Sequence, residues 1–340
     1  MHNQTKKSTC ERPSVSLAAL SQSLFFLKIR GVMEKVPNEI LIHILEKCDT
    51  ADWIGFRATS TRNHAVGSYV LGKSQTFDFR HYNNHCHYGI CRCLNVENDE
   101  KINGTNLNPT KMINFMGFLP SLRKIVLADL PCVLTMSDMI KLGKSVPNVQ
   151  KIIIIQNEDK KWLGNDVLMG LTYFKSLVKL KLDGWEPTTI TRRGCASRIE
   201  AIPQSTLRKL VNFHIVCRQE TVSTVLRYII DNEVIMAKCV KAKFNVRLSS
   251  PDIPHLILKF IEFHRKIQKI HFNGFLFTTQ EQVQAFYDHL LNLPQLETVR
   301  IENCSVIERI EHALQRTFLD ALRKRGIKFT CLVTSLRHGY

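Results

Sequence analysis

The sequence predicts an α/β fold in which a short α-helical N-terminal module precedes a curved solenoid with parallel strands. Two observations lead to this prediction. Residues 36–60 repeat apolar side chains at helical spacing and carry helix-capping residues between the runs. After residue 120, an apolar three-position pattern returns at intervals of 27 to 33 residues, with amphipathic helical segments between its copies.

The helical module starts at Pro37, which suits the first turn of a helix because its missing N–H has no partner there. Asp49 and Thr50 end this first helix and can cap the next one, and Ser60 or Thr61 offers a further cap. The apolar face of the first helix comprises Ile40, Leu41, Ile44, Leu45 and Cys48. Short helices cannot bury so much apolar surface among themselves, so we expect a partner.

This segment resembles an F-box through Pro37, Glu39, Ile40, Ile44, Leu45, Asp52, Trp53 and Ser60. Val36, Thr59 and Asn63 depart from the family pattern, which usually has leucine, valine and tryptophan there. F-boxes dock onto a Skp-type adaptor and, through it, onto cullin and RING subunits. The resemblance therefore implies adaptor contacts at Pro37, Glu39, Ile40, Ile44, Leu45, Asp52, Trp53 and Phe56. An ordinary helical subdomain is the alternative.

The three-position pattern is an apolar residue, a second three residues later and a third two residues after that. Its copies are Leu122-Ile125-Leu127, Val149-Ile152-Ile154, Leu177-Leu180-Leu182, Leu210-Phe213-Ile215, Ile267-Ile270-Phe272 and Leu296-Val299-Ile301. One interval of 57 residues is close to two periods, and Phe244-Val246-Leu248 lies inside it as a degenerate copy. Alternation of apolar and polar residues predicts a strand in each copy. Helices are predicted at 137–146, 165–175, 221–231, 254–265, 279–293 and 310–325, and a closing strand at 327–333.

A strand and a helix in each period resemble the unit of leucine-rich repeats of the irregular type that accompanies F-boxes, and also the domains associated with nematode F-boxes. One such unit cannot bury its apolar face alone, so the resemblance implies a stacked array. A generic α/β domain with coincidental spacing is the alternative. The expected organisation is a disordered extension at 1–32, an F-box at 33–75, a linker and first strand region at 76–118, a leucine-rich-repeat-like substrate-recognition domain at 119–333 and a tail at 334–340.

Composition predicts a protein of the cytoplasm, the nucleus or both. The eleven cysteines have no regular spacing, which favours free thiols over a disulfide framework. No apolar run approaches the roughly 20 residues of a membrane-spanning helix, so no membrane association is expected. Residues 1–32 are basic and contain serine, which also fits a mitochondrial targeting peptide, although we favour a disordered extension.

The formal net charge of +17 raises the question of nucleic acid, but no zinc-finger, RNA-recognition or basic-zipper motif accompanies it. Nucleic-acid binding is therefore not expected. Basic residues instead occupy outward positions of the strand copies, at Lys124, Lys151, Lys179, Lys181, Lys269 and Arg300. Such a stripe would attract acidic or phosphorylated targets, or it keeps an exposed face soluble. Trp162 and Trp185 follow strand copies and are candidate substrate anchors or packing residues of the loops.

No catalytic residue, metal site or cofactor is predicted. Histidines and cysteines gather at His81, His85, Cys86, His87, Cys91 and Cys93, but their spacing fits no known zinc finger, and a polar loop is the favoured interpretation. Gly-x-Ser-x-Gly and His-Glu-x-x-His motifs are missing from the sequence. The expected function is a non-catalytic substrate-recognition subunit of a Skp–cullin–F-box ubiquitin ligase, bound to an unknown protein substrate. A non-degradative adaptor-binding scaffold and a basic nucleic-acid-binding protein are the alternatives.

Overall fold

The computed structural model describes residues 35–46, 56–78, 109–128, 130, 132–156, 162–164, 166–186, 189–190, 198–199, 202–247, 252–330 and 333–335. The chain divides into two compact units, Met1–Val70 and Leu71–Tyr340, with the boundary inside helix α4 (Thr61–Lys73). The division falls close to the end of the expected module at residue 75.

The first unit contains helix α2 (Asn38–Leu45) and the beginning of α4. Pro37 is the residue before α2 rather than its first residue, and its carbonyl accepts the first helical hydrogen bond, from Leu41. At the start of α4, Ser60 Oγ accepts from the backbone N–H of Asn63 at 3.1 Å, which is the cap expected from the sequence. The small core joins Leu41 and Leu45 of α2 to Val66 and Val70 of α4, with Val36, Ile42 and Phe56 against it.

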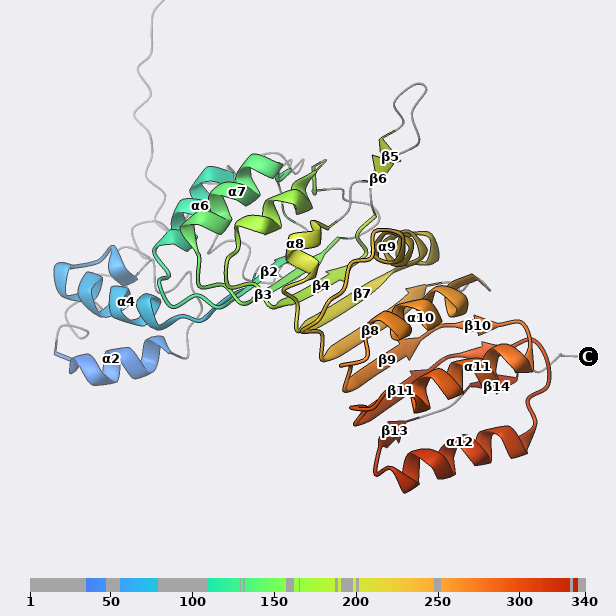
Figure 1. Ribbon diagram of the computed structural model, residues 1–340. Coiled ribbons are helices and arrows are strands. Elements are labelled where there is room, and N and C mark those ends of the chain that lie inside the picture. The colour runs from blue at the N-terminus through green and yellow to red at the C-terminus, as the bar shows by residue number, and fades with distance from the viewer. Residues whose placement is uncertain are drawn as a thin grey trace, which may run out of the picture. The chain divides into compact units, whose positions relative to one another are not determined.

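The second unit is built on a parallel sheet whose strands follow one another in chain order (Figure 1). Its strands, in order across the sheet, are β1 (Thr76–Asp78), β2 (Lys124–Ala128), β3 (Lys151–Ile155), β4 (Lys179–Asp183), β7 (Asn212–Arg218), β8 (Lys241–Arg247), β9 (Lys269–Asn273), β11 (Thr298–Glu302) and β13 (Lys328–Thr330). Every pairing between neighbours is parallel. The predicted α/β fold with parallel strands is thus confirmed.

Helices connect these strands and lie side by side along one face of the sheet (Figure 1). They are α6 (Pro109–Gly117), α7 (Met136–Ser145), the 3-10 helix η1 (Val167–Tyr173), α8 (Gln204–Leu207), α9 (Gln219–Asp231), α10 (Asp252–Phe263), α11 (Gln280–Leu291) and α12 (His312–Lys324). Most consecutive helices contact each other: α6 with α7, α7 with η1, η1 with α8, α9 with α10, α10 with α11, and α11 with α12. Crossovers between parallel strands share one hand, so an array that always adds its next strand on the same side keeps its helices on one face.

Two smaller sheets complete the described part of this unit. Strands β10 (Leu276–Phe277), β12 (Ser305–Val306) and β14 (Thr334–Ser335) pair in parallel just beyond the main sheet. Strands β5 (Thr189–Ile190) and β6 (Arg198–Ile199) form an antiparallel pair. None of these short strands was predicted, because two residues are too few to show an alternating pattern.

The repeat positions are equivalent in the structure. Each first-position residue lies two residues before its strand and is buried: Leu122, Val149, Leu177, Leu210, Cys239, Ile267 and Leu296. The backbone N–H of each one donates to the carbonyl three residues earlier, so the same turn opens seven strands. The copy expected at Phe244-Val246-Leu248 is wrong, because the register places Phe244 in the third position, beside Ile215 and Phe272. The true copy is Cys239-Ala242-Phe244, whose first two residues are small.

Aromatic side chains fill the layer between sheet and helices. Phe244 on β8 lies edge-on to Phe260 of α10, with ring centroids 5.1 Å apart, and stacks on Phe272 of β9 at 6.2 Å. Phe286 of α11 continues this cluster against Phe272 at 4.9 Å. Among the described residues, no helix has the length and apolarity that crossing a membrane requires.

Candidate functional site

Strand residues that point away from the helices form rows across the open face of the sheet, because paired strands bring equivalent positions side by side. The row at the start of the strands is dominated by lysine. Its members are Lys124, Lys151, Lys179, Asn212, Lys241, Lys269, Thr298 and Lys328. We call this set the first row.

The next outward position, two residues further along each strand, gives a second row that is basic over five neighbouring strands. It runs through Lys181, His214, Lys243, His271 and Arg300 on β4, β7, β8, β9 and β11. Alternate side chains on these strands are buried against the helices, for example Phe213, Phe244 and Phe272. The alternation therefore places a dense band of cationic and imidazole groups on the face opposite the described helices.

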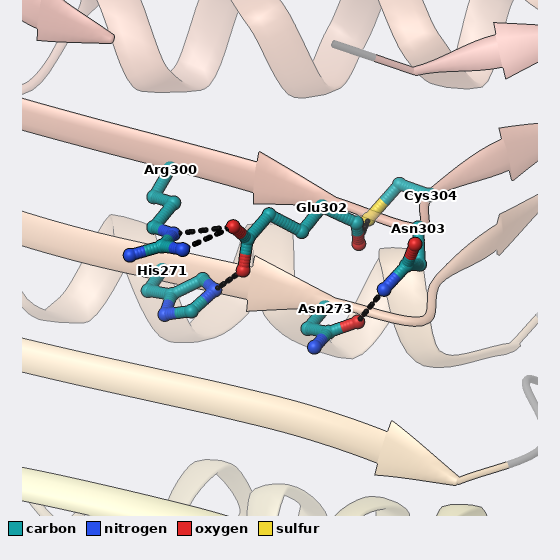
Figure 2. Close-up of polar contacts among 6 residues, drawn as sticks. All are labelled: His271, Asn273, Arg300, Glu302, Asn303 and Cys304. Carbon is teal, nitrogen blue, oxygen red and sulfur yellow. Dashed lines mark hydrogen bonds and ion pairs between the residues drawn. The ribbon is translucent and has the colours of Figure 1, made fainter. Parts of the chain in front are cut away.

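Carboxylates balance this charge at two ends of the second row. On β4, Lys181 Nζ donates to Asp183 Oδ2 at 2.8 Å. On β11, Glu302 takes hydrogen bonds from Arg300 Nε at 2.6 Å and from His271 Nε2 at 2.8 Å, as Figure 2 shows. The same figure shows Asn303 Nδ2 donating to Asn273 Oδ1 at 3.1 Å, which joins the ends of β9 and β11. The carboxylates thus fix the outer cations of the row.

Burial and like charge change the pKa values of this band. Burial, then the charges of Lys243 and Lys181, lowers the pKa of His214 to about 3. Burial and the charge of Lys243 also lower the pKa of His271, against the opposing effect of Glu302. The pKa of Lys243 itself is lowered by burial and by Arg300. The hydrogen bond from Arg300, assisted by that from His271, lowers the pKa of Glu302. The central histidine is therefore neutral at physiological pH.

The predicted basic residues Lys124, Lys151, Lys179, Lys181, Lys269 and Arg300 all occupy outward positions in the observed register. Lys124, Lys151 and Lys179 are direct neighbours on three adjacent strands. Sequence reasoning missed Lys241 and Lys243, because it did not recognise the copy that starts at Cys239. With that copy in register, alternation along β8 would have found both lysines.

Of the two interpretations given for Trp162 and Trp185, their burial supports packing residues rather than exposed substrate anchors. Trp162 is 2% exposed, and its indole Nε1 donates to the carbonyl of Ile155 at 3.2 Å. Trp185 is 6% exposed. Both rings are buried in the protein, which removes their apolar surface from water. Almost no surface of either ring is therefore exposed for contact with a target.

In the first unit, α2 presents two different faces. Leu41 and Leu45 are buried, whereas Ile40 and Ile44 are 51% and 42% exposed. Leu45 therefore belongs to the core of the unit and not to the exposed face expected for it, because its position follows Leu41 by one helical turn. Pro37 and Glu39 are exposed beside Ile40, and Phe56 is half-buried against the core. Asp52 and Trp53 lie outside the described residues.

Thiol and metal chemistry receive little support from the described part of the chain. Cys132, Cys217, Cys239 and Cys304 are buried, and burial raises the pKa of Cys132, Cys239 and Cys304 to about 12. Groups of three or more metal-binding side chains do not occur within the ranges described above. The histidine and cysteine cluster at residues 81–93 and the thiol of Cys48 lie outside these ranges.

No protein-family model and no curated protein matches the chain. The features of the chain itself that bear on function are the exposed isoleucines of α2 and the basic open face of the sheet.

Proposed function

We propose that this protein is the substrate-recognition subunit of a Skp–cullin–F-box ubiquitin ligase. Residues 33–75 act as an F-box that docks onto the Skp-type adaptor, and through it onto cullin and RING subunits. The strand-and-helix repeats form a curved leucine-rich-repeat-like solenoid that holds a target protein on its open face. The observation that carries this proposal is the division of α2 into a buried and an exposed apolar pair.

The exposed pair has a physical cost that a partner would remove. Ile40 and Ile44 are one helical turn apart and about half of each side chain is in water, while Leu41 and Leu45 already satisfy the core of the unit. Full burial of an isoleucine stabilises a protein by about 1.5–3 kcal/mol, so covering the exposed half of both contributes about 2 kcal/mol to binding. Exposed Pro37 extends the same surface toward the start of the helix. This surface suits an apolar docking groove on an adaptor.

The chemistry proposed for the chain is proximity. A receptor that holds the adaptor and the target at once raises the concentration of target lysines around the thioester carried by the ligase complex. Such a subunit needs no catalytic group of its own. The basic rows of the sheet supply a surface that attracts acidic targets, since exposed charges steer association over about 10 Å at 0.1 M salt.

The docking surface is tested by two variants that separate contact from folding. The double change Ile40→Ala and Ile44→Ala should leave the thermal midpoint of the protein unchanged and reduce capture of co-expressed Skp-type adaptor by about 30-fold, the equivalent of 2 kcal/mol. Leu45→Ala removes a core side chain, which costs about 2–5 kcal/mol. It should therefore lower stability as well as capture. Val133→Ala changes an exposed residue of the second unit and serves as the matched control.

Undiminished adaptor capture by the Ile40, Ile44 double variant would refute the F-box proposal. Turnover of a bound target then separates the ligase from a non-degradative scaffold. If the protein is a ligase subunit, the wild type shortens the half-life of the target and the Ile40, Ile44 double variant does not. If it is a scaffold, the half-life of the target is the same with either protein.

A further inference from the structure

The positive charge of the open face is unequally compensated from strand to strand. On β4 and β11, the cation of the second row is followed two residues later by a carboxylate, in Lys181-x-Asp183 and Arg300-x-Glu302. On β8 the residue in that place is Asn245, two residues after Lys243. Within the described part of the chain, no carboxylate lies at ion-pair distance from Lys241 or Lys243. The central lysines therefore lack the adjacent carboxylate that Lys181 and Arg300 have, and the charge of the more distant Glu302 opposes the lowering of the Lys243 pKa only in part.

His214 lies beside these lysines and has an unmet hydrogen-bonding group. It is the register partner of Lys181 on one side and Lys243 on the other. Its Nε2 atom is buried and has no hydrogen-bond partner. A buried polar atom without a partner is unfavourable. Burial first, and like charge after it, lowers the pKa of His214 and of Lys243, and this like charge is unfavourable too. One acceptor-rich anion would relieve both.

We propose that Lys241, Lys243 and His214 bind a phosphoryl group carried by a serine or threonine of the target protein, with Lys181 at the rim of the site. The inference rests on the proposed function for its target and names the class of that target. The phosphoryl oxygens accept hydrogen bonds from the two ammonium groups and from the His214 Nε2–H. The lysine side chains turn outward to admit the anion, and Asn245 contributes amide donors at the end away from Lys241.

The surroundings favour a single phosphorylated residue over an extended nucleic acid. Asp183 and Glu302 stand on either side of the site, on strands four sheet positions apart, or about 19 Å at the usual strand spacing. These carboxylates would repel a polyanion that crossed the sheet. Outward positions of the described main-sheet strands also hold no phenylalanine, tyrosine or tryptophan, whereas proteins that bind single-stranded nucleic acid stack successive bases on such rings.

The test measures binding of fluorescein-labelled peptides to the full chain by anisotropy at fixed salt. One peptide pool carries a central phosphoserine between randomised residues, and a second pool carries serine in its place. We expect the phosphoserine pool to bind at least tenfold more tightly. Lys243→Gln should remove this preference. Asn245→Asp should remove it too, because it restores the carboxylate that β4 and β11 already have.

Lys124→Gln is the matched control, since it removes the same charge from the same face four strand positions away. It should change the affinity less than threefold. Equal weakening by Lys124→Gln and Lys243→Gln would overturn the site, because diffuse charge would then explain the binding. Equal affinity for both peptide pools would overturn it as well. Tighter binding of a single-stranded RNA that is lost in Lys243→Gln would replace it with a nucleic-acid site.

Adaptor capture by the same proteins keeps this inference distinct from the proposed function. Lys243→Gln and Asn245→Asp leave α2 unchanged, so both should capture adaptor as well as the wild type does. Failure of adaptor capture alongside intact phosphopeptide selectivity would refute the ligase function and leave the anion site standing. Intact capture without phosphopeptide selectivity would refute the anion site alone.

Discussion

Replacing Gly274 with alanine should weaken the second unit at the seam between β8 and β9. Gly274 follows β9 with φ of 80°, and its N–H donates to the carbonyl of Glu302 at 3.1 Å. A Cβ at this position would lie 2.3 Å from the carbonyl oxygen of Val246 on β8. Ordinary contacts between carbon and oxygen begin near 3.3 Å, so the two backbones must separate by about 1 Å.

The size of the effect follows from two contributions. A left-handed conformation costs alanine about 1–2 kcal/mol. Separation of the strands weakens one or two ladder hydrogen bonds, each contributing about 0.5–1.5 kcal/mol. Gly274→Ala should therefore lower the free energy of unfolding by about 2–5 kcal/mol. Gly326 has φ of 68° but no atom within 4 Å of its Cβ position, so Gly326→Ala carries only the first cost, about 1–2 kcal/mol.

Urea unfolding followed by tryptophan fluorescence measures this difference. Replacing Trp53 by phenylalanine in every variant leaves the signal of the buried Trp162 and Trp185, both in the second unit. Gly274→Asn adds a further control, because asparagine tolerates positive φ better than alanine but still carries a Cβ. It should lose almost as much stability as Gly274→Ala. Equal losses in Gly274→Ala and Gly326→Ala would refute the reasoning, since contact with β8 would then contribute nothing.

Two further predictions concern a carboxylate and a helix cap. The pKa of Glu302 is lowered in the folded protein, so its stabilisation is present above the unfolded value of about 4.3 and is lost as pH falls through the lower folded pKa. Glu302→Gln should therefore lose less stability than the wild type between pH 6 and pH 3 in urea unfolding, and an unchanged pH dependence would contradict this. Thr135 Oγ1 accepts from the Asp138 N–H at 3.2 Å, and Asp138 Oδ2 accepts from the Thr135 N–H at 3.0 Å. Thr135→Ala should cost about 1 kcal/mol by thermal unfolding, whereas an unaltered midpoint would show that the cap is dispensable.

The main sheet could be predicted from sequence because its copies share a physical requirement. Each strand must bury alternate residues against a helix, so Ile152 and Ile154 have counterparts in Leu180 and Leu182. The requirement is that these positions are buried, and it does not fix the residue type. Cys239-Ala242-Phe244 meets it with two small residues, so a pattern of leucine-like residues does not identify this copy. Side-chain caps show the same limit: Thr279 Oγ1 caps α11, but Gln282 Oε1 accepts from Thr278 N–H at 2.8 Å, one residue before the position that a capping box requires.

The candidate site was only partly predictable. Alternation along single strands identified Lys181 and Arg300 as outward residues, but it could not predict which side chains of the adjacent strands lie beside them. Neighbours depend on register between strands that are about 30 residues apart, which brings His214 between Lys181 and Lys243. The two interpretations of the tryptophans stayed open for a related reason: a loop position in the sequence does not reveal whether a large ring points toward solvent or into the protein.

The ends of the main sheet differ from its middle. Its first and last strands, β1 and β13, have three residues each, whereas the strands between them have five or seven. An outermost strand offers unpaired N–H and C=O groups to any other chain with an extended segment, and a long, flat edge would invite polymerisation. The two edge strands are short and each carries a charged residue, Asp78 or Lys328. They therefore offer a second copy of this protein few backbone groups for strand pairing. A single molecule can thereby contain a parallel sheet of many strands without pairing its edge strands with those of another molecule.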